Sequence, residues 1–144
     1  MRKTLFYIIT ACLLTLLAAC GPSAAPGPGG PQPTGGTVTL TLQTPTETWA
    51  DAVSVSFSPG ASAFDVLLDY AKTASIPVDY SGSGTLAYIQ GINNLYEFDD
   101  GPESGWLYSV NDAYPATGCG AYAINDGDKL VFLYVTEKTA WEGQ

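Results

Sequence analysis

The stretch FDDGPESGWLYSVN, residues 98–111, has the most distinctive pattern in the chain. In its second half, Trp106, Tyr108 and Val110 alternate with other residues and lie on one side, whereas Leu107 lies on the other. This alternation is typical of a β-strand. The first half is rich in Gly, Pro and acidic residues, which favour turns. The stretch therefore predicts an acidic turn that leads into a strand with an aromatic face.

Five other segments outside this stretch favour strands or turns. Val38–Leu42 and Val53–Ser58 alternate apolar with polar residues, which predicts two half-buried strands. Leu86–Ile92 is apolar and rich in strand formers, and Lys129–Val135 is apolar on both sides, as expected of a central strand. Asn125–Asp128 reads Asn-Asp-Gly-Asp and predicts the turn before that last strand.

One helix is expected between the second and third of these strands. Ser62 with Asp65 three residues later is typical of a helix start, and Pro77 is expected to end the element. Apolar residues follow at helical spacing on one stripe: Phe64, Leu67, Leu68 and Ala71. Roughly five strands and one helix predict an α+β domain in which the helix packs on a sheet.

The charge balance excludes several classes of function. The 144 residues include 5 Lys and Arg, 14 Asp and Glu, and no histidine. If a leader containing Arg2 and Lys3 is removed, the net charge becomes 3 − 14 = −11. Such a chain repels phosphate backbones, so no nucleic-acid partner is expected. Without histidine there is no Ser-His or Cys-His nucleophile and no His-ligated zinc, and we expect the protein not to be an enzyme.

The first residues predict export and lipidation. A basic start and an apolar run from Leu5 to Ala18 indicate a signal peptide over residues 1–19. The run ends in Leu-Ala-Ala-Cys, which resembles the lipobox of bacterial lipoproteins, in which Cys20 is acylated and becomes the new N-terminus. The alternative is an ordinary secretory signal that is cleaved nearby. In the linker, residues 21–36, eleven of sixteen residues are Pro or Gly, which predicts a disordered tether.

The stretch 98–111 and the later Asp-Gly-Asp turn also resemble a known family. It is a bacterial domain family of undetermined function related to the C-terminal domain of transcobalamin and intrinsic factor, and the likeness covers residues 37–138, leaving 139–144 as a tail. The resemblance implies a β-grasp-like fold, a small mixed sheet with one packed helix. In transcobalamin the equivalent domain closes over a cobalamin held against a helical barrel, so the resemblance makes a corrinoid the first ligand to test. No such barrel is expected within these 144 residues.

Aromatic residues provide the candidate binding site. Together with a Gly-Cys-Gly loop that we expect to be mobile, they could form a flat, partly apolar platform for a ring-shaped ligand. The alternative for Trp106 and Tyr108 is that they only fill the core under the helix. The tentative ligand-binding residues are Trp106, Tyr108, Tyr114, Pro115, Thr117, Cys119 and Tyr122.

Cys119 has no partner for an internal disulfide, because Cys12 lies in the leader and Cys20 is expected to be acylated. We expect a small buried apolar residue, with ligation of cobalt or another soft metal, or pairing with another chain, as the alternatives.

The acidic clusters, one at 99–103 and one at 126–128, are interpreted as turn chemistry and a solvated rim. Calcium binding is the alternative, and paired-carboxylate catalysis is a more distant one.

These observations favour an extracytoplasmic, lipid-anchored binding domain at the cell envelope. Its expected ligand is a corrinoid captured for an uptake transporter. The alternative is a cell-surface module that contacts a protein or a glycan and has no small-molecule ligand.

Overall fold

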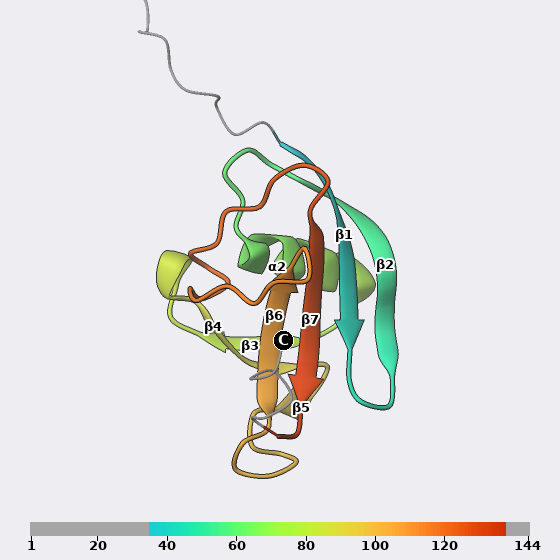
Figure 1. The fold of residues 1–144 in the computed structure, drawn as a ribbon, viewed down its shortest axis with the longest axis vertical. Coiled ribbons are helices and arrows are strands. Elements are labelled where there is room, and N and C mark those ends of the chain that lie inside the picture. Colours follow the sequence, from blue (N-terminus) through green and yellow to red (C-terminus); the bar gives the residue numbers. More distant parts are fainter. Residues whose placement is uncertain (1–34, 138–144) are drawn as a thin grey trace, which may run out of the picture. The chain divides into compact units, whose positions relative to one another are not determined.

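Two β-sheets and one α-helix make up residues 35–137, the part of the chain that the computed structural model describes (Figure 1). The predicted signal peptide, the lipidation at Cys20, most of the linker and the tail lie outside these residues. The larger sheet contains β1 (Gly36–Gln43), β2 (Thr48–Phe57), β6 (Gly105–Val110) and β7 (Lys129–Val135) in the order β2-β1-β7-β6. Because β1 and β7 are parallel and the other pairs antiparallel, the sheet is mixed, and the predicted α+β class is confirmed.

Strand β7 is central, as its apolar pattern predicts. It pairs with β1 on one side and β6 on the other, and its alternate residues Leu130, Phe132 and Tyr134 are almost fully buried. In the register, Trp106 lies opposite Tyr134 and Tyr108 opposite Phe132. Opposed residues share a face, so the aromatic face of β6 lies on the core side of the sheet.

A second sheet of three short strands was not expected from the sequence. It contains β3 (Val78–Ser81), β4 (Tyr88–Ile92) and β5 (Leu95–Tyr96) in the order β3-β4-β5. The prediction of roughly five strands is therefore wrong, because β3 and β5 are too short to show a period. Leu86, predicted to begin a strand, lies in a 3-10 turn, η1 (Gly84–Leu86), where Gly84 has φ +54° and Leu86 is 80% exposed.

Helix α2 (Ala63–Ala74) begins where the sequence predicts. The Ser62 hydroxyl accepts from the Asp65 backbone N–H at 3.2 Å, and the Asp65 carboxylate accepts from the Ser62 N–H at 2.8 Å, which completes a capping box. The helix ends earlier than expected, because Ser75 takes the left-handed conformation at φ 57°, two residues before Pro77.

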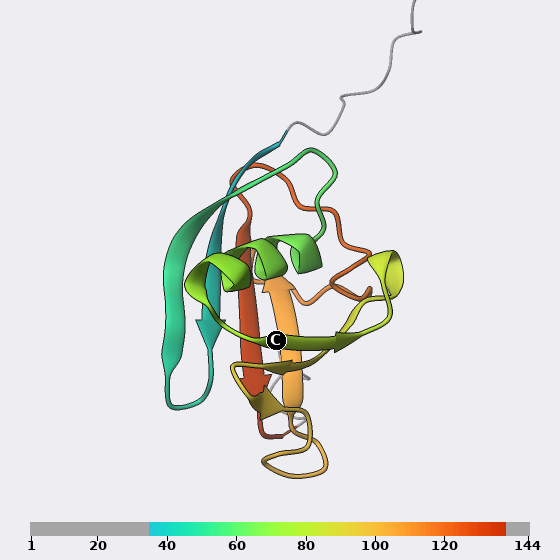
Figure 2. The ribbon, with the colours of Figure 1, turned by 180° about the vertical axis from the view of Figure 1, so that it is seen from behind.

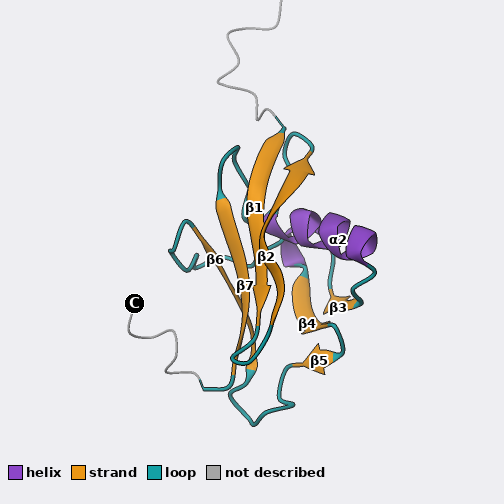
Figure 3. Ribbon diagram, turned by 90° about the vertical axis from the view of Figure 1, so that its right-hand side faces the viewer, coloured by secondary structure: helices purple, strands orange, loops and turns teal. Residues whose placement is uncertain are grey.

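The helix and the small sheet cover the same face of the large sheet (Figures 2 and 3). Figure 2 shows α2 crossing the large sheet, and Figure 3 shows β3, β4 and β5 beside it on that side. Most of the predicted helical stripe is buried there, with Phe64, Leu67 and Ala71 in the core and Leu68 half-buried. The core thus lies between the large sheet and a cover made of one helix and three short strands.

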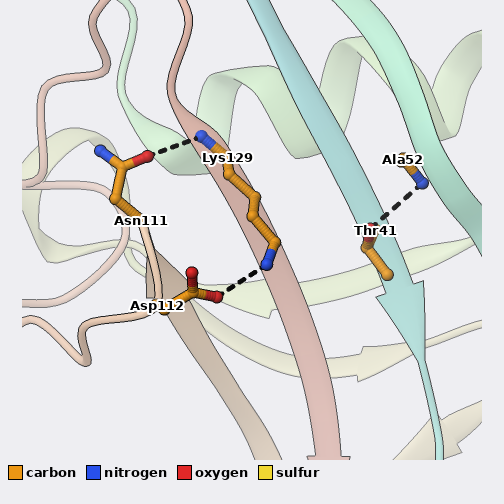
Figure 4. Close-up of polar contacts among 5 residues, drawn as sticks. All are labelled: Thr41, Ala52, Asn111, Asp112 and Lys129. Carbon is orange, nitrogen blue, oxygen red and sulfur yellow. Dashed lines mark hydrogen bonds and ion pairs between the residues drawn. The ribbon is translucent and has the colours of Figure 1, made fainter.

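Polar side chains secure two irregular points of the large sheet (Figure 4). The Thr41 hydroxyl accepts from the backbone N–H of Ala52, a residue at φ 47° beside the register shift between β1 and β2. At the other edge, the Asn111 amide oxygen accepts from the Lys129 N–H at 2.9 Å, and the Lys129 ammonium lies 2.7 Å from Asp112. The ion pair is solvent exposed, so we expect it to contribute little to stability.

Candidate functional site

A pocket of about 500 Å³ lies between β4, β6 and the loop of residues 114–119. Its walls are largely aromatic, and no charged side chain among the described residues lines it. The aromatic residues of the lining are Tyr88, Trp106, Tyr108, Tyr114 and Phe132. A concave, mostly apolar surface of this volume is suited to a small organic ligand.

The structure brings the tentative site residues together. Five of the seven line the pocket, namely Trp106, Tyr108, Tyr114, Pro115 and Cys119. The other two adjoin it: the Thr117 carbonyl accepts from the Tyr108 hydroxyl at 2.6 Å, and the Tyr122 ring lies edge-on to Tyr108 at 6.2 Å. Their role in binding remains a prediction.

Trp106 and Tyr108 belong to both the core and the pocket wall. The Trp106 ring packs edge-on against Tyr134 at 5.3 Å, and its indole N–H donates to the Leu95 carbonyl at 2.9 Å. Tyr108 stacks on Phe132 at 6.0 Å. Burial is the largest cause that raises the pKa of Tyr108, so its hydroxyl stays protonated and continues to donate to the loop. Both rings are therefore held rigidly where they face the pocket.

The loop that forms the other wall is anchored by the helix. The Cys119 carbonyl accepts from the Phe64 N–H at 3.2 Å, and the Tyr122 carbonyl accepts from the Ala63 N–H at 2.9 Å. These donors belong to the first turn of α2, where backbone N–H groups have no partner within the helix. The helix start therefore positions the loop.

The expectation of a mobile Gly-Cys-Gly loop is wrong. A Cβ atom at Gly120 would lie 2.2 Å from the carbonyl oxygen of Gly84 and 3.0 Å from the Cβ of Ala87. Glycine occurs at position 120 because two backbones approach each other closely there, and this contact holds the loop against η1.

Cys119 is a buried free cysteine, which confirms the expectation of a small apolar residue. Only 6% of its surface is exposed, and burial raises the pKa of the thiol above its ordinary value. A protonated thiol is a poor metal ligand, so this environment favours packing over ligation.

The contribution of β4 to the pocket could not be found from the sequence. Ala87, which follows η1, and Tyr88 and Ile89, which begin β4, line the pocket, yet nothing in their local pattern relates them to residues 106–119. The Tyr88 hydroxyl donates to the Glu97 carboxylate at 2.6 Å, and this bond is the largest cause that raises the pKa of Tyr88 to about 12.

The acidic clusters serve turns, as interpreted, but Asp128 is not part of a solvated rim. The Asp99 carboxylate accepts from the Tyr96 N–H, and Asp126 accepts from the Thr37 N–H, each at 2.8 Å. Asp128 is buried and accepts from the Asn111 amide and the Asn125 N–H, also at 2.8 Å. Within residues 35–137, no group of three or more Asp, Glu, Cys or His is arranged to hold a metal ion.

Comparison with known proteins reports both a family and a fold. Residues 60–136 match the family described as Domain of unknown function (DUF4430). Haptocorrin, in a crystal structure of its complex with Cbi, superposes with a TM-score of 0.63 at 16% identity, over 76% of this chain and 27% of that chain. The match thus spans about a quarter of haptocorrin and shows a shared fold, as the transcobalamin resemblance predicts.

A second solved structure, from Ruminococcus gnavus ATCC 29149 and described in terms of metal binding, has a TM-score of 0.48 at 15% identity, over 69% of this chain and 96% of that chain. No curated protein matches the sequence. In the part of the chain that the structure describes, no helix is long and apolar enough to cross a membrane.

Proposed function

This chain belongs to the DUF4430 family, and we propose that its domain binds a small-molecule ligand in the pocket between β4, β6 and the loop of residues 114–119. One observation carries the proposal: five of the residues that the sequence predicts as ligand contacts line the same pocket. They come from β6 and from the loop that follows it.

The chemistry of the lining supports a flat ligand with little net charge. Aromatic walls offer a large apolar contact area, and the lining includes few polar groups, among them Tyr114. A corrinoid has a flat ring with neutral amide side chains, so a chain with net charge −9 presents no electrostatic obstacle to it. The fold shared with haptocorrin and the transcobalamin resemblance make a corrinoid the first ligand to test.

Calorimetric titration of the full chain with cyano- and hydroxocobalamin tests the corrinoid proposal. We expect saturable heat and a change in the cobalamin absorption spectrum at micromolar concentrations. Tyr114→Ala should weaken binding about tenfold, equivalent to about 1.4 kcal/mol, because it removes one wall of the pocket. Phe98→Ala is the matched control, since Phe98 is an exposed aromatic residue that does not line the pocket. Absence of both heat and spectral change would refute corrinoid binding.

In this proposal the domain is tethered outside the cell through an acylated Cys20. The lipobox-like end of the apolar leader supports the anchor, because two acyl chains hold a protein at a bilayer far longer than one. As a flexible coil, the Pro- and Gly-rich linker would let the domain reach roughly 20–25 Å from the surface. Labelled palmitate should be incorporated into the full chain and not into a Cys20→Ala variant.

A surface module that binds another protein is the second candidate. Large apolar side chains are exposed along residues 80–98, including Leu86 at 80%, Phe98 at 62% and Tyr88 at 55%. Large exposed apolar side chains are typical of interaction surfaces where they form one patch. Pull-down from envelope extracts should lose its partner in a Leu86→Ser, Phe98→Ser double variant while cobalamin titration is unchanged. If the double variant keeps its partner and its cobalamin titration changes, the small-molecule function is favoured.

A further inference from the structure

A second cavity, of about 610 Å³, lies apart from the first, where the turn between β1 and β2, strand β5 and the end of β7 meet. Figures 1 and 3 both show these three segments together at the lower end of the domain. Nothing in the proposed function uses this cavity, and its lining differs from that of the first pocket.

One side of the second cavity is a fixed indole ring. Trp49 is half-buried, and its Nε1–H donates to the Glu47 carboxylate at 2.9 Å. Its ring also packs against Trp106, with centroids 5.8 Å apart. Leu95 extends this apolar surface, whereas Tyr134 is almost fully buried and adds little accessible area. A ring held at two points loses little freedom when a ligand packs on its exposed side.

Residues with side-chain oxygen atoms share the lining with this ring. The lining contains the carboxyl groups of Glu47 and Asp100 and the hydroxyl groups of Thr46 and Thr136. No side-chain hydrogen bond within residues 35–137 engages the Asp100 carboxylate or the two threonine hydroxyls. The cavity therefore combines an apolar platform with hydrogen-bonding groups that a ligand can use.

We propose that this second cavity is a saccharide-binding site. A pyranose ring has an apolar face of C–H groups, which can pack on the Trp49 ring, and a border of hydroxyl donors, which the carboxylates can accept. Among residues 35–137, the lining includes no Lys or Arg, so an anionic ligand would meet two carboxylates without a compensating cation from this part of the chain. Since Trp49 alone among the described lining residues offers an accessible ring, the cavity is a platform and not the aromatic cage that suits an organic cation.

The test is a heteronuclear NMR titration of the full chain with maltotriose, cellotriose and the trimer of N-acetylglucosamine. We expect at least one trisaccharide to shift the Trp49 indole N–H signal saturably, with little dependence on salt. The Trp49→Phe variant identifies that signal and should weaken binding severalfold. Trp49→Ala should abolish binding, with circular dichroism used to verify that it is folded.

Two further variants separate a saccharide from a cation. Asp100→Asn keeps a hydrogen-bond acceptor, so it should weaken saccharide binding only severalfold, and Asp51→Asn, an exposed carboxylate of β2 outside the cavity, should have no effect. Tyr114→Ala should also leave saccharide binding unchanged, which distinguishes this site from the first pocket. The proposal is overturned if none of the trisaccharides gives a saturable shift. It is equally overturned if choline or spermidine binds more tightly than the trisaccharides and is lost in Asp100→Asn and in high salt.

Discussion

The close approach of residue 120 to η1 can be tested by comparing two glycines of one loop. Neither Gly118 nor Gly120 has a left-handed φ, so alanine is conformationally acceptable at both positions. A Cβ at Gly118 would meet only the Ala87 carbonyl oxygen, at an ordinary 3.9 Å. A Cβ at Gly120 would lie 2.2 Å from the Gly84 carbonyl oxygen, a backbone atom that cannot move without displacing the turn. The two substitutions therefore differ mainly in crowding.

The expected difference in the free energy of unfolding between the two variants follows from two opposing effects. Replacing glycine by alanine restricts the unfolded chain, which stabilises the fold by about 0.4–1 kcal/mol at a compatible site. Overpacking at Gly120 costs about 1–3 kcal/mol, so Gly120→Ala should be destabilised by about 1–2 kcal/mol net. In a domain of about 100 residues this corresponds to a melting temperature lower by about 5–15 °C. Gly118→Ala should be unchanged or slightly more stable than the natural protein.

Urea and thermal unfolding followed by circular dichroism measure both variants under the same conditions. The Gly120→Ala variant should also bind less ligand in the first pocket, because the loop and Ala87, the residue that follows η1, both line that pocket. If Gly120→Ala proved as stable as Gly118→Ala, the loop would not be held by this backbone contact, and the expectation of a mobile Gly-Cys-Gly loop would be restored.

Three other predictions concern the helix cap, the aromatic core and a titrating tyrosine. Ser62→Ala removes the capping box and should lower the free energy of unfolding by about 1 kcal/mol in urea titrations; an unchanged midpoint would contradict the cap. Trp106→Ala should cost about 3 kcal/mol or more and largely unfold the domain, since the ring fills the core and bonds the Leu95 carbonyl; a folded variant that binds normally would refute this placement. The pKa of Tyr88 is raised from 10 to about 12, chiefly by its hydrogen bond to Glu97. The stabilisation of the folded state by this hydrogen bond is therefore complete below pH 10 and is lost as the pH rises through about 12. Glu97→Gln should lower that pKa, as measured by tyrosinate absorbance with Tyr88→Phe as the reference.

Local patterns were sufficient for the longer elements of this domain. The capping box at Ser62, the helical stripe from Phe64 and the continuous apolar pattern of Lys129–Val135 each predict an element that the structure contains. The same approach missed β3 and β5, which have four and two residues. Segments so short form strands only because β4 lies between them, and this pairing is not encoded in their own spacing.

Part of the candidate pocket could also be predicted from the local sequence pattern. Trp106 and Tyr108 are adjacent on one strand face, and Tyr114 and Cys119 follow in the next loop, so sequence proximity related them. Tyr88 comes from another sheet and was missed, as was the second cavity, whose Trp49 and Asp100 lie on segments distant in the chain.

The amino-acid order alone was enough for the α+β class, the core face of β6, the helix boundaries to within a few residues and the exclusion of histidine chemistry, because these depend on periodicity, capping and composition. The second sheet, the anchored Gly120 and the meeting of β4 with β6 needed the folded chain. They depend on contacts between residues far apart in sequence, where a backbone approach of a few ångströms determines which side chains face a common cavity.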